Sequence, residues 1–465
     1  MNAFNRVTDK DMAYFSSLMP GRVFGKDEIL SDYAHDEMTE YGSFLPEAVL
    51  QALSAEEICA VLKYCNERRI PVTPRGAGTG LCGGCVAVHG GVVLSTEKMK
   101  KVLEVDTDNL TATLEPGVLL MEFPKALEGT GLFYPPDPGE KTATMGGNAM
   151  TNAGGMRAVR YGVTRDYILG MDVALADGTL IHLGGKTVKT SSGYSLIDLM
   201  IGSEGTLGFL TRLTVKLIPE PAANVSLLIP FAELDACIGA VPKLLKSGCE
   251  PTAIEFMERE VISCAEDYLG KQFPDTGADA YLLVRLDGAS AQALEKPIEL
   301  LTDTALSLGA KDVLLADTDE RKESIWNARG AFLEAIKGST DTMDECDVVV
   351  PRNAIAEFVA KMTEIARDAQ IRIHSFGHAG DGNLHIYVCR DALPEDEWKQ
   401  KLSGVMERLY AEARRLRGQV SGEHGIGHAK KQFLSDSLGQ KQIELMRGIK
   451  AVFDPNGILN PGKVV

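Results

Sequence analysis

Pro74-Arg75-Gly76-Ala77-Gly78-Thr79-Gly80 is a glycine-rich loop between two short apolar segments, and it decides how the first half of the chain folds. Residues 70–73 before the loop and 91–95 after it are rich in β-branched side chains and predict buried strands. Upstream, Ser54-Ala-Glu-Glu57 has the sequence of a capping box, and apolar residues at helical spacing predict a helix from there to about Arg69. The loop therefore joins two predicted strands.

Residues 78–83, Gly-Thr-Gly-Leu-Cys-Gly, match the G-x-G-x-x-G fingerprint of dinucleotide-binding Rossmann folds. That fingerprint requires a helix directly after the loop and an acidic residue about 20 positions later. Here residues 86–91 lead into another strand, which argues against a Rossmann fold. Successive backbone N–H groups of a glycine-rich loop can still bind phosphate, and Arg75 could add positive charge.

Residues 131–155 are rich in turn-forming residues. They contain Pro135-Pro136-Asp137-Pro138, Gly146-Gly147-Asn148 and Asn152-Ala153-Gly154-Gly155. This composition predicts a loop around a ligand rather than a helix or a long strand. Further on, Asp177-Gly178 predicts a hairpin over residues 172–183, and another strand is expected from Gly208 to Ile218.

Pro219-Glu-Pro221 marks the clearest change of pattern along the chain. Beyond it the sequence predicts two β-α-β units: strand 225–230, helix 234–247 and strand 253–257, then strand 281–286, helix 292–308 and strand 312–316. This pattern is typical of a ferredoxin-like antiparallel sheet with helices on one face. Helices are also expected from Arg321, Ala354 and Glu395, and the turn-rich residues 454–463 are expected to dock on the protein. We predict an α+β protein with domains at 1–220 and 221–410, and a segment at 411–465 that returns to the first domain.

The composition disfavours several classes of protein. The 465 residues carry 48 basic and 65 acidic side chains, a formal net charge of −17, which disfavours nucleic acid and anionic membranes as partners. Neither a signal peptide nor an integral membrane segment is expected, so we predict a cytoplasmic protein. The 9 cysteines are scattered and predict reduced thiols, with packing favoured over a redox pair for Cys82-Gly-Gly-Cys85.

Five of the 8 histidines lie between His374 and His428. Two glycine-rich strings occupy this region, Gly377-His378-Ala379-Gly380-Asp381-Gly382-Asn383-Leu384-His385 and Ser421-Gly422-Glu423-His424-Gly425-Ile426-Gly427. Together they supply imidazoles and a carboxylate, the ligand set of a metal site with N and O donors, and His424 adds a candidate base. A single histidine is more often structural, and we assign that role to His35, His89, His182, His374 and His428.

These motifs together resemble a known family. The FAD domain of the vanillyl-alcohol oxidase flavoprotein superfamily is similar to this chain at residues 74–80, Pro135 to Pro138, Gly146 to Asn148, Asn152 to Gly155 and Gly202-Ser203-Glu204-Gly205-Thr206-Leu207-Gly208. Its FAD-linked 2-hydroxy-acid dehydrogenase branch is similar at residues 377–385, Gly422-Glu423-His424-Gly425 and Asn460-Pro461-Gly462-Lys463. That branch includes glycolate oxidase D-subunits, D-lactate dehydrogenases and D-2-hydroxyglutarate dehydrogenases. The resemblance, which runs from about residue 40 to residue 465, implies an FAD-binding domain of this type plus a ferredoxin-like antiparallel-sheet cap domain.

The resemblance also implies how FAD is bound. Covalent attachment in this superfamily commonly uses a histidine of the first glycine loop, and none lies between Pro74 and Val88, so noncovalent FAD is expected. The implied cofactor-binding residues are Arg75, Gly76, Ala77, Gly78, Thr79, Gly80, Pro138, Thr144, Gly147, Asn148, Asn152, Gly155, Glu204, Gly205 and Asn460.

The implied chemistry is the oxidation of a 2-hydroxy acid, in which the C2 hydride leaves to the flavin and the hydroxyl loses its proton. A divalent metal ion (Zn, Fe or Mn) on the substrate hydroxyl and carboxylate would lower the pKa of the hydroxyl. The implied roles are metal ligand for His378, His385 and Glu423, general base for His424, orientation of the substrate oxygen for Asn383 and carboxylate binding for Arg329.

Glu345 favours a small substrate. The hydroxyglutarate dehydrogenases resemble this chain but place a lysine where Glu345 stands, and an acidic residue there would repel a second substrate carboxylate. We therefore expect D-lactate first and glycolate second. The alternatives are a dehydrogenase for D-2-hydroxyglutarate or another D-2-hydroxy acid, a noncatalytic flavin subunit of a glycolate oxidase complex and, less favoured, a metal-dependent hydrolase.

The acceptor of the electrons is expected to be another molecule, because the sequence shows neither a cysteine cluster for iron–sulfur relays nor a convincing nicotinamide site. A separate electron-transfer flavoprotein, an iron–sulfur subunit, a quinone and oxygen are the candidates. We rank a protein acceptor first, because no amphipathic helix that could face a quinone in the membrane is evident. The oligomeric state stays open, with a homodimer among the options.

Overall fold

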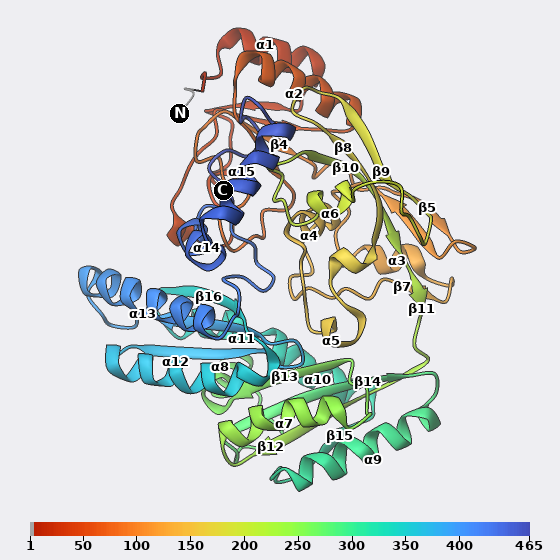
Figure 1. Cartoon of the computed structure of the whole chain (residues 1–465), viewed down its shortest axis with the longest axis vertical. Coiled ribbons are helices and arrows are strands. Elements are labelled where there is room, and N and C mark those ends of the chain that lie inside the picture. The colour runs from red at the N-terminus through yellow and green to blue at the C-terminus, as the bar shows by residue number, and fades with distance from the viewer. Residues whose placement is uncertain (1–3) are drawn as a thin grey trace. The chain divides into compact units, whose positions relative to one another are not determined.

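The computed structural model describes residues 4–465, which form two compact units (Figure 1). The first unit contains the residues up to Ala153, Val163–Glu220 and Glu423–Val465, and the second contains Gly154–Gly162 and Pro221–Gly422. The predicted bounds 1–220, 221–410 and 411–465 differ from this division in two places. Residues 154–162 belong to the second unit because Arg160 and Tyr161 bind Asp287 there. The chain leaves that unit at Gly422 rather than at 410 because α13 (Glu395–Arg415) packs on α12 (Ile355–Ala369).

The first sheet of the first unit holds the glycine-rich loop. Its strand order is β1 (Val23–Gly25), β2 (Ala48–Gln51), β4 (Val92–Ser95) and β3 (Val72–Arg75), with β2, β4 and β3 parallel. The predicted helix is α2 (Ala55–Arg68), which lies near α1 (Asp9–Leu18) in Figure 1 and buries its apolar face. The Ser54 hydroxyl accepts from the Glu57 N–H at 3.3 Å, whereas the Glu57 carboxylate accepts from the N–H of Leu53, so half of the predicted capping box forms.

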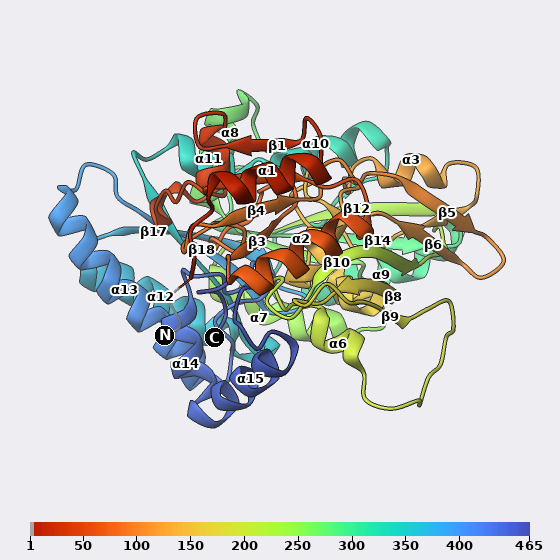
Figure 2. The same ribbon diagram turned by 90° about the horizontal axis from the view of Figure 1, so that it is seen from above.

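The second sheet of this unit is antiparallel. Its order is β5 (Val102–Asp106), β6 (Thr111–Leu114), β10 (Phe209–Lys216), β8 (Ile168–Ala174) and β9 (Leu180–Gly184), and β7 (Leu132–Phe133) pairs separately with β11 (Ile218–Pro219). The hairpin predicted around Asp177-Gly178 joins β8 to β9. Gly178 has φ +82°, a conformation that glycine adopts without strain. In Figure 2 the segment between β9 and α6 (Leu196–Met200) forms a long loop.

A short helix lies inside residues 131–155, where the prediction of an unbroken loop was wrong. This helix, α4 (Met145–Thr151), begins at Thr144, whose hydroxyl accepts from the Gly147 N–H at 3.1 Å. A Cβ at Gly146 would lie 2.6 Å from the Cβ of Pro116. The glycines that suggested turns therefore allow this helix to pack closely on residue 116. The remaining short helix here is α3 (Phe123–Leu127).

The C-terminal turn docks on the first sheet, as predicted. It follows α14 (Lys431–Leu438) and α15 (Gln440–Phe453). The N–H of Val72 donates to the Ile458 carbonyl, and the N–H of Asn460 donates to the Val72 carbonyl, each at 2.8 Å. Leu459 thus continues the sheet beside β3 and is fully buried.

The second unit is built on one antiparallel sheet of order β15-β12-β14-β13-β17-β18-β16. Its strands are β12 (Ala223–Phe231), β13 (Ala253–Glu258), β14 (Ala280–Gly288), β15 (Leu314–Ala316), β16 (Met343–Val349), β17 (Arg372–His378) and β18 (Asn383–Cys389). Its other helices are α5 (Ala158–Tyr161), α7 (Leu234–Lys246), α8 (Arg259–Leu269), α9 (Ala291–Ser307), α10 (Asp319–Gly330) and α11 (Phe332–Gly338). Both predicted β-α-β units are present, as β12-α7-β13 and β14-α9-β15.

Helices cover both faces of this sheet, whereas the sequence predicted one covered face. One layer is α7, α9, α12 and α13 (Figure 1). On the opposite face α8, α10 and α11 pack on apolar side chains such as Met257, Tyr281 and Phe376. The reason is that central strands such as β13 bury apolar residues on both sides, and each face needs cover. No helix among residues 4–465 is long and apolar enough to cross a membrane.

Candidate active site

The glycine-rich loop of the first unit packs tightly on its own surroundings. Gly78 has φ +84°, and a Cβ there would lie 2.1 Å from Nη2 of Arg75; a Cβ at Gly76 would lie 2.3 Å from Oγ1 of Thr144. The buried Arg75 guanidinium donates to the carbonyls of His35 at 2.9 Å and Asp32 at 2.8 Å. Arg75 therefore ties the loop to residues 32–35, and its role toward a phosphate stays a prediction.

Asp36 supports the other end of this loop, and the sequence analysis did not single it out. Its Oδ2 accepts from the N–H of Gly83 at 2.5 Å and its Oδ1 accepts from the N–H of Met38 at 3.1 Å. Burial raises the pKa of Asp36 to about 6, although both hydrogen bonds act to lower it. No local sequence pattern marks this residue.

The amide of Asn148 tests whether the residues around the loop fit a bound cofactor. Asn148 lies on α4 and is buried, and its Nδ2 has no hydrogen-bond partner among residues 4–465. A buried donor of this kind is costly unless a ligand or water accepts from it. Together with the glycine backbone of residues 76–80, it fits a polar, phosphate-containing cofactor such as FAD.

The other predicted cofactor residues lie at turns. Asn152 caps α4 with φ +53° and accepts from the N–H of Arg165 at 3.0 Å, and the Pro138 carbonyl accepts from Lys141 at 2.9 Å. Gly155, by contrast, lies in the second unit. The members of the predicted set in the first unit are Arg75, Gly76, Ala77, Gly78, Thr79, Gly80, Pro138, Thr144, Gly147, Asn148, Asn152, Glu204, Gly205 and Asn460.

Glu204 anchors the segment that carries the candidate base. It is buried, and its carboxylate oxygens accept from the N–H groups of Ile426 at 2.6 Å and Gly427 at 2.7 Å. Burial raises the pKa of Glu204, although these bonds oppose the shift. The Asn460 amide donates to the Glu204 carbonyl at 2.7 Å and to the Gly84 carbonyl at 2.8 Å. Two predicted cofactor residues thus also hold the loop after His424.

Cys82 and Cys85 make packing contacts, in keeping with the role expected for them. The Cys82 thiol donates to the His424 carbonyl at 3.0 Å, and the Cys85 sulfur accepts from Arg75 at 3.2 Å. Burial raises the pKa of both thiols, which keeps them protonated and weakly reactive.

Two of the predicted metal ligands come together on the second unit. His378 ends β17 and His385 lies on β18, diagonal neighbours on one face of the sheet. Both are buried, and their Nε2 atoms are 3.4 Å apart. Zinc–nitrogen bonds of about 2.0–2.1 Å at a tetrahedral angle would place two ligand nitrogens about 3.3 Å apart. The pair therefore fits two ligands of one metal ion. Glu423, the third predicted ligand, follows Gly422 and opens the last segment of the first unit.

A buried glutamate that the sequence analysis missed links this pair to Arg329. Glu255 lies opposite His378 in the β13–β17 register and contacts its Nδ1 at 2.8 and 2.9 Å. Arg329, on α10, donates to Glu255 through Nε at 3.0 Å and Nη2 at 2.7 Å. Burial would raise the pKa of Glu255, but its interactions with His378 and Arg329 lower it below its usual value. An acidic residue inside the apolar run Ala253–Met257 was the available signal.

Two further carboxylates lie on the same face, near His385. Oxygens of Glu345 and Asp347, on β16, each lie 3.9 Å from Nδ1 of His385. The Tyr387 hydroxyl donates to Glu345 at 3.0 Å, and burial together with this charge raises the pKa of Tyr387 well above its usual value. The histidine pair is therefore surrounded by acidic groups that favour a cation.

The side-chain amide of Asn383 donates hydrogen bonds within the second unit, one of them to Asp347. Its Nδ2 donates to Oδ1 of Asp347 at 2.6 Å and to the Val348 carbonyl at 2.9 Å. Oδ2 of Asp347 accepts from the Ser421 hydroxyl at 2.8 Å and from the Gly422 N–H at 3.0 Å. This cluster fixes the chain directly before Glu423. The predicted contact of Asn383 with a substrate oxygen stays a prediction.

Two family models match this chain. Residues 46–184 match the family described as FAD binding domain, and residues 220–464 match the family described as FAD linked oxidases, C-terminal domain. The chain belongs to the FAD-linked oxidases. A D-lactate dehydrogenase of Anaerostipes hadrus is 51% identical over 466 residues, which cover 99% of this chain and 98% of that protein. Glycolate oxidase subunit GlcD of Bacillus subtilis (strain 168) is 40% identical, covering 93% and 91%.

The fold of this FAD-linked oxidase has solved counterparts. The crystal structure of p-cresol methylhydroxylase with substrate bound matches 98% of this chain and 97% of its own, with a TM-score of 0.82 and 19% identity, a likeness of fold alone. These findings confirm the predicted fold class, the resemblance to the D-lactate dehydrogenase and glycolate oxidase branch, and an FAD-dependent oxidoreductase.

Two other histidines of this FAD-linked oxidase, His374 and His428, pack against neighbouring side chains. His374 is buried beside Arg372, 2.9 Å from its Nη1, and burial lowers the pKa of His374 to about 4. His428 packs between Phe44 and the backbone of Gly83, and burial lowers its pKa to about 4 as well. Both stay neutral at neutral pH and are not candidates for the proton transfer.

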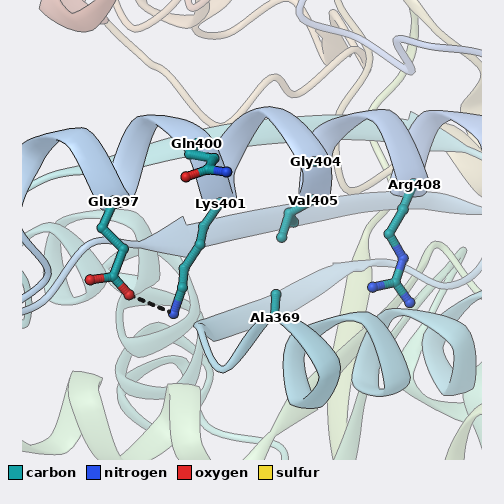
Figure 3. A pocket seen from close by; sticks show the side chains of 7 residues that line it. All are labelled: Ala369, Glu397, Gln400, Lys401, Gly404, Val405 and Arg408. Atoms are coloured by element: carbon teal, nitrogen blue, oxygen red, sulfur yellow. Dashed lines mark ion pairs between the residues drawn. The ribbon is translucent and has the colours of Figure 1, made fainter.

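A groove of about 460 Å³ on this FAD-linked oxidase lies apart from the histidine pair, where α13 faces α12. Figure 3 shows Lys401 reaching Glu397 along α13, at 3.1 Å, and Arg408 pairs with Asp368 at 2.8 Å. These helices belong to the layer on the opposite face of the sheet from His378 and His385. The lining of this groove contains none of the predicted site residues.

Proposed function

We propose that this FAD-linked oxidase oxidises a short D-2-hydroxy acid, D-lactate first and glycolate second, to the 2-oxo acid. The observation that carries the proposal is the arrangement on the second unit, where one histidine of a close pair and a guanidinium share one buried carboxylate. The names of the relatives from Anaerostipes hadrus and Bacillus subtilis support the same substrate class.

His378, His385 and Glu423 would hold a divalent metal ion, whose chemistry is to lower the pKa of the substrate hydroxyl and to fix the hydroxyl and carboxylate together. Two neutral imidazoles and one carboxylate leave coordination positions for such a chelate. The 3.4 Å separation of the two Nε2 atoms supports this assignment, as do the nearby buried carboxylates.

Arg329 would bind the substrate carboxylate. Glu255 binds the edge of the Arg329 guanidinium that is formed by Nε and Nη2, so Nη1 does not donate to Glu255. The guanidinium carbon lies 4.5 Å from the centre of the Phe376 ring, a cation–π contact on one face of the group. A planar, held fork suits the recognition of a carboxylate.

His424 would accept the proton of the substrate hydroxyl, a task for which imidazole is suited near neutral pH. Bound FAD supplies the acceptor for the C2 hydride. The backbone around His424 is fixed through its carbonyl, which accepts from Cys82, and through the Glu204 contacts with residues 426 and 427. Asn383 would help to orient the substrate oxygen, directly or through Asp347.

Glu345 supports a monocarboxylate as the substrate. It is buried on the same face as the histidine pair, beside Asp347. A second substrate carboxylate near these groups would meet like charge, which is the basis for preferring D-lactate or glycolate over D-2-hydroxyglutarate.

We further propose a separate electron-acceptor protein in the cytoplasm, an electron-transfer flavoprotein or an iron–sulfur subunit. The word subunit in the name of the Bacillus subtilis relative supports a partner. Rapid reduction of a soluble quinone analogue with no protein partner added would count against this choice.

The test of the proposed reaction is anaerobic bleaching of the bound flavin by D-lactate, L-lactate, glycolate and D-2-hydroxyglutarate. Each acid is mixed with the FAD-loaded protein before its metal is chelated, after chelation, and after metal is added back. We expect rapid bleaching by D-lactate that is lost on chelation and restored by metal. No bleaching by any of the four acids, with FAD bound and metal present, would favour a noncatalytic flavin subunit.

A further inference from the structure

Glu255 contacts two groups to which the proposed function gives separate tasks. Its carboxylate is completely buried on β13 and bonds to Nδ1 of His378 and to the guanidinium of Arg329. We infer that Glu255 is a positioning residue that fixes His378 as a metal ligand and Arg329 as a carboxylate-binding group at the same time. This inference rests on the proposed function, which names the roles of those two residues but not what holds them.

The contact with His378 determines which ring nitrogen can bind a metal. Both Glu255 oxygens lie within 2.9 Å of Nδ1, and an ionised carboxylate only accepts hydrogen bonds, so the proton of the neutral ring sits on Nδ1. Nε2 then carries the free lone pair, and Nε2 is the atom that faces His385. A metal-ligating histidine usually has its other nitrogen held in this way, which orients the ring and raises its basicity.

The contact with Arg329 sets the plane of the guanidinium. Two nitrogens on one edge share a single Glu255 oxygen, while the ring of Phe376 lies under the group and Phe332 lies beside it. Removing Glu255 would free the fork to rotate and would leave a buried positive charge without its partner. One substitution should therefore weaken metal binding and substrate binding together, which loss of a merely structural contact would not do.

Glu258 provides a matched control on the same strand. It lies three residues further along β13, so its side chain leaves the opposite face of the sheet, and it accepts a hydrogen bond from Ser375 of β17. It is a glutamate bonded across the same pair of strands, but it touches neither a histidine nor an arginine of the site.

The experiment compares the FAD-loaded wild type with Glu255→Gln, Glu255→Asp and Glu258→Gln. After chelation, the apparent dissociation constant for zinc is measured by competition with a chelating dye, and KM and kcat for D-lactate are measured with a soluble dye acceptor. Glu255→Gln should bind zinc about 10–100-fold more weakly, and KM should rise about tenfold because the fork is released. Glu255→Asp, which keeps the charge, should recover part of both losses, and Glu258→Gln should stay within about threefold of the wild type.

The outcomes separate this inference from the proposed function. A wild type that binds zinc, with Glu255→Gln equal to it in zinc affinity and KM, would overturn the role of Glu255 alone. A wild type that neither binds zinc nor loses activity on chelation would overturn the metal-dependent reaction and this role with it. If Glu255→Gln does not fold, Glu255→Gln combined with Arg329→Gln removes both buried charges, and unchanged zinc affinity in that variant would likewise contradict the inference.

Discussion

The glycine-rich loop of the first unit lies so close to the side chains around it that no Cβ fits at Gly76 or Gly78, whereas the histidine pair of the second unit is held by hydrogen bonds from side chains on distant strands. Gly76 and Gly78 are needed because a Cβ at either would collide with Thr144 or Arg75. His378 instead depends on Glu255, 123 residues earlier in the chain. The first kind of site tolerates almost no added atom, and the second kind tolerates little change of charge or hydrogen bonding.

The largest expected effect comes from the second unit. His378→Asn should remove metal binding and lower turnover of D-lactate by more than the roughly 100-fold seen when only a partner of a metal-ligating histidine is lost. Flavin content and the visible spectrum should stay those of the wild type, because no predicted cofactor-binding residue changes. Metal analysis measures the bound metal, and anaerobic flavin reduction measures the reaction with D-lactate. His374→Asn, on the same strand, is the control, and equal losses in both variants would contradict the assignment.

The next largest effect should come from the first unit, where a substitution should reduce bound FAD rather than bound metal. Gly78→Ala adds a Cβ at φ +84° that would lie 2.1 Å from Arg75, so the variant should lose about 1–3 kcal/mol of unfolding free energy and retain less FAD. Gly193→Ala is the matched control, because Gly193 has a similar φ of +93° and nothing within 4 Å of the added Cβ. The ratio of flavin to protein absorbance after gel filtration checks this. Equal flavin loss in both variants would mean that strain alone, and not the crowded loop, is responsible.

The contrast also explains which parts of the molecule could be predicted. The glycine-rich loop, the hairpin at Asp177-Gly178 and the two β-α-β units follow from local sequence, and the structure contains each. The helix α4 was missed because Gly146 and Gly147 weaken a helix locally, and the Thr144 cap and the packing on Pro116 stabilise it.

In the candidate site the histidines could be found from sequence, but their supports could not. Glu255 and Asp347 are buried acidic residues in strands that also bury apolar side chains, and strand order and register decide what they contact. A sequence shows that such a residue is unusual in a buried strand. It does not show that Glu255 faces both His378 and Arg329.

A smaller effect is expected from the residue that holds the chain before Glu423. Asp347→Asn keeps one acceptor oxygen but cannot serve Ser421, Gly422 and Asn383 together, so kcat for D-lactate should fall about tenfold. Flavin content should not change. Asp344→Asn on the other face of β16 is the control for the strand. A Asp347→Asn variant with wild-type kcat would show that this cluster does not position Glu423 or His424.

The smallest effect returns to the first unit and concerns pH. Because the pKa of Asp36 is raised from 3.8 to about 6, the folded protein holds a proton between these values that the unfolded chain has lost. The stabilisation that this proton gives the folded protein is therefore complete below pH 4 and is lost as the pH rises through 6. The difference between about 6 and 3.8, at 1.36 kcal/mol for each pKa unit, corresponds to about 3 kcal/mol, of which about half is lost between pH 5 and pH 7.5. The unfolding free energy of the wild type, relative to that of Asp36→Asn, should therefore fall by about 1.4 kcal/mol from pH 5 to pH 7.5. Urea unfolding of the FAD-loaded proteins measures both values.

Asp11 gives the comparison its control, because its pKa moves the other way. Burial would raise the pKa of Asp11, but hydrogen bonds from Thr8, Tyr64 and Arg68 lower it below its usual value. Its contribution to stability is present above the usual pKa near 3.8 and is lost only as the pH falls below that value, so Asp11→Asn should show no change relative to wild type between pH 5 and pH 7.5. If Asp36→Asn behaves like Asp11→Asn, then Asp36 is ionised in the folded protein throughout this range. The Gly83 N–H would then donate to a full negative charge at every pH tested, so charge would matter to the crowded loop of the first unit as it does to the histidine pair of the second.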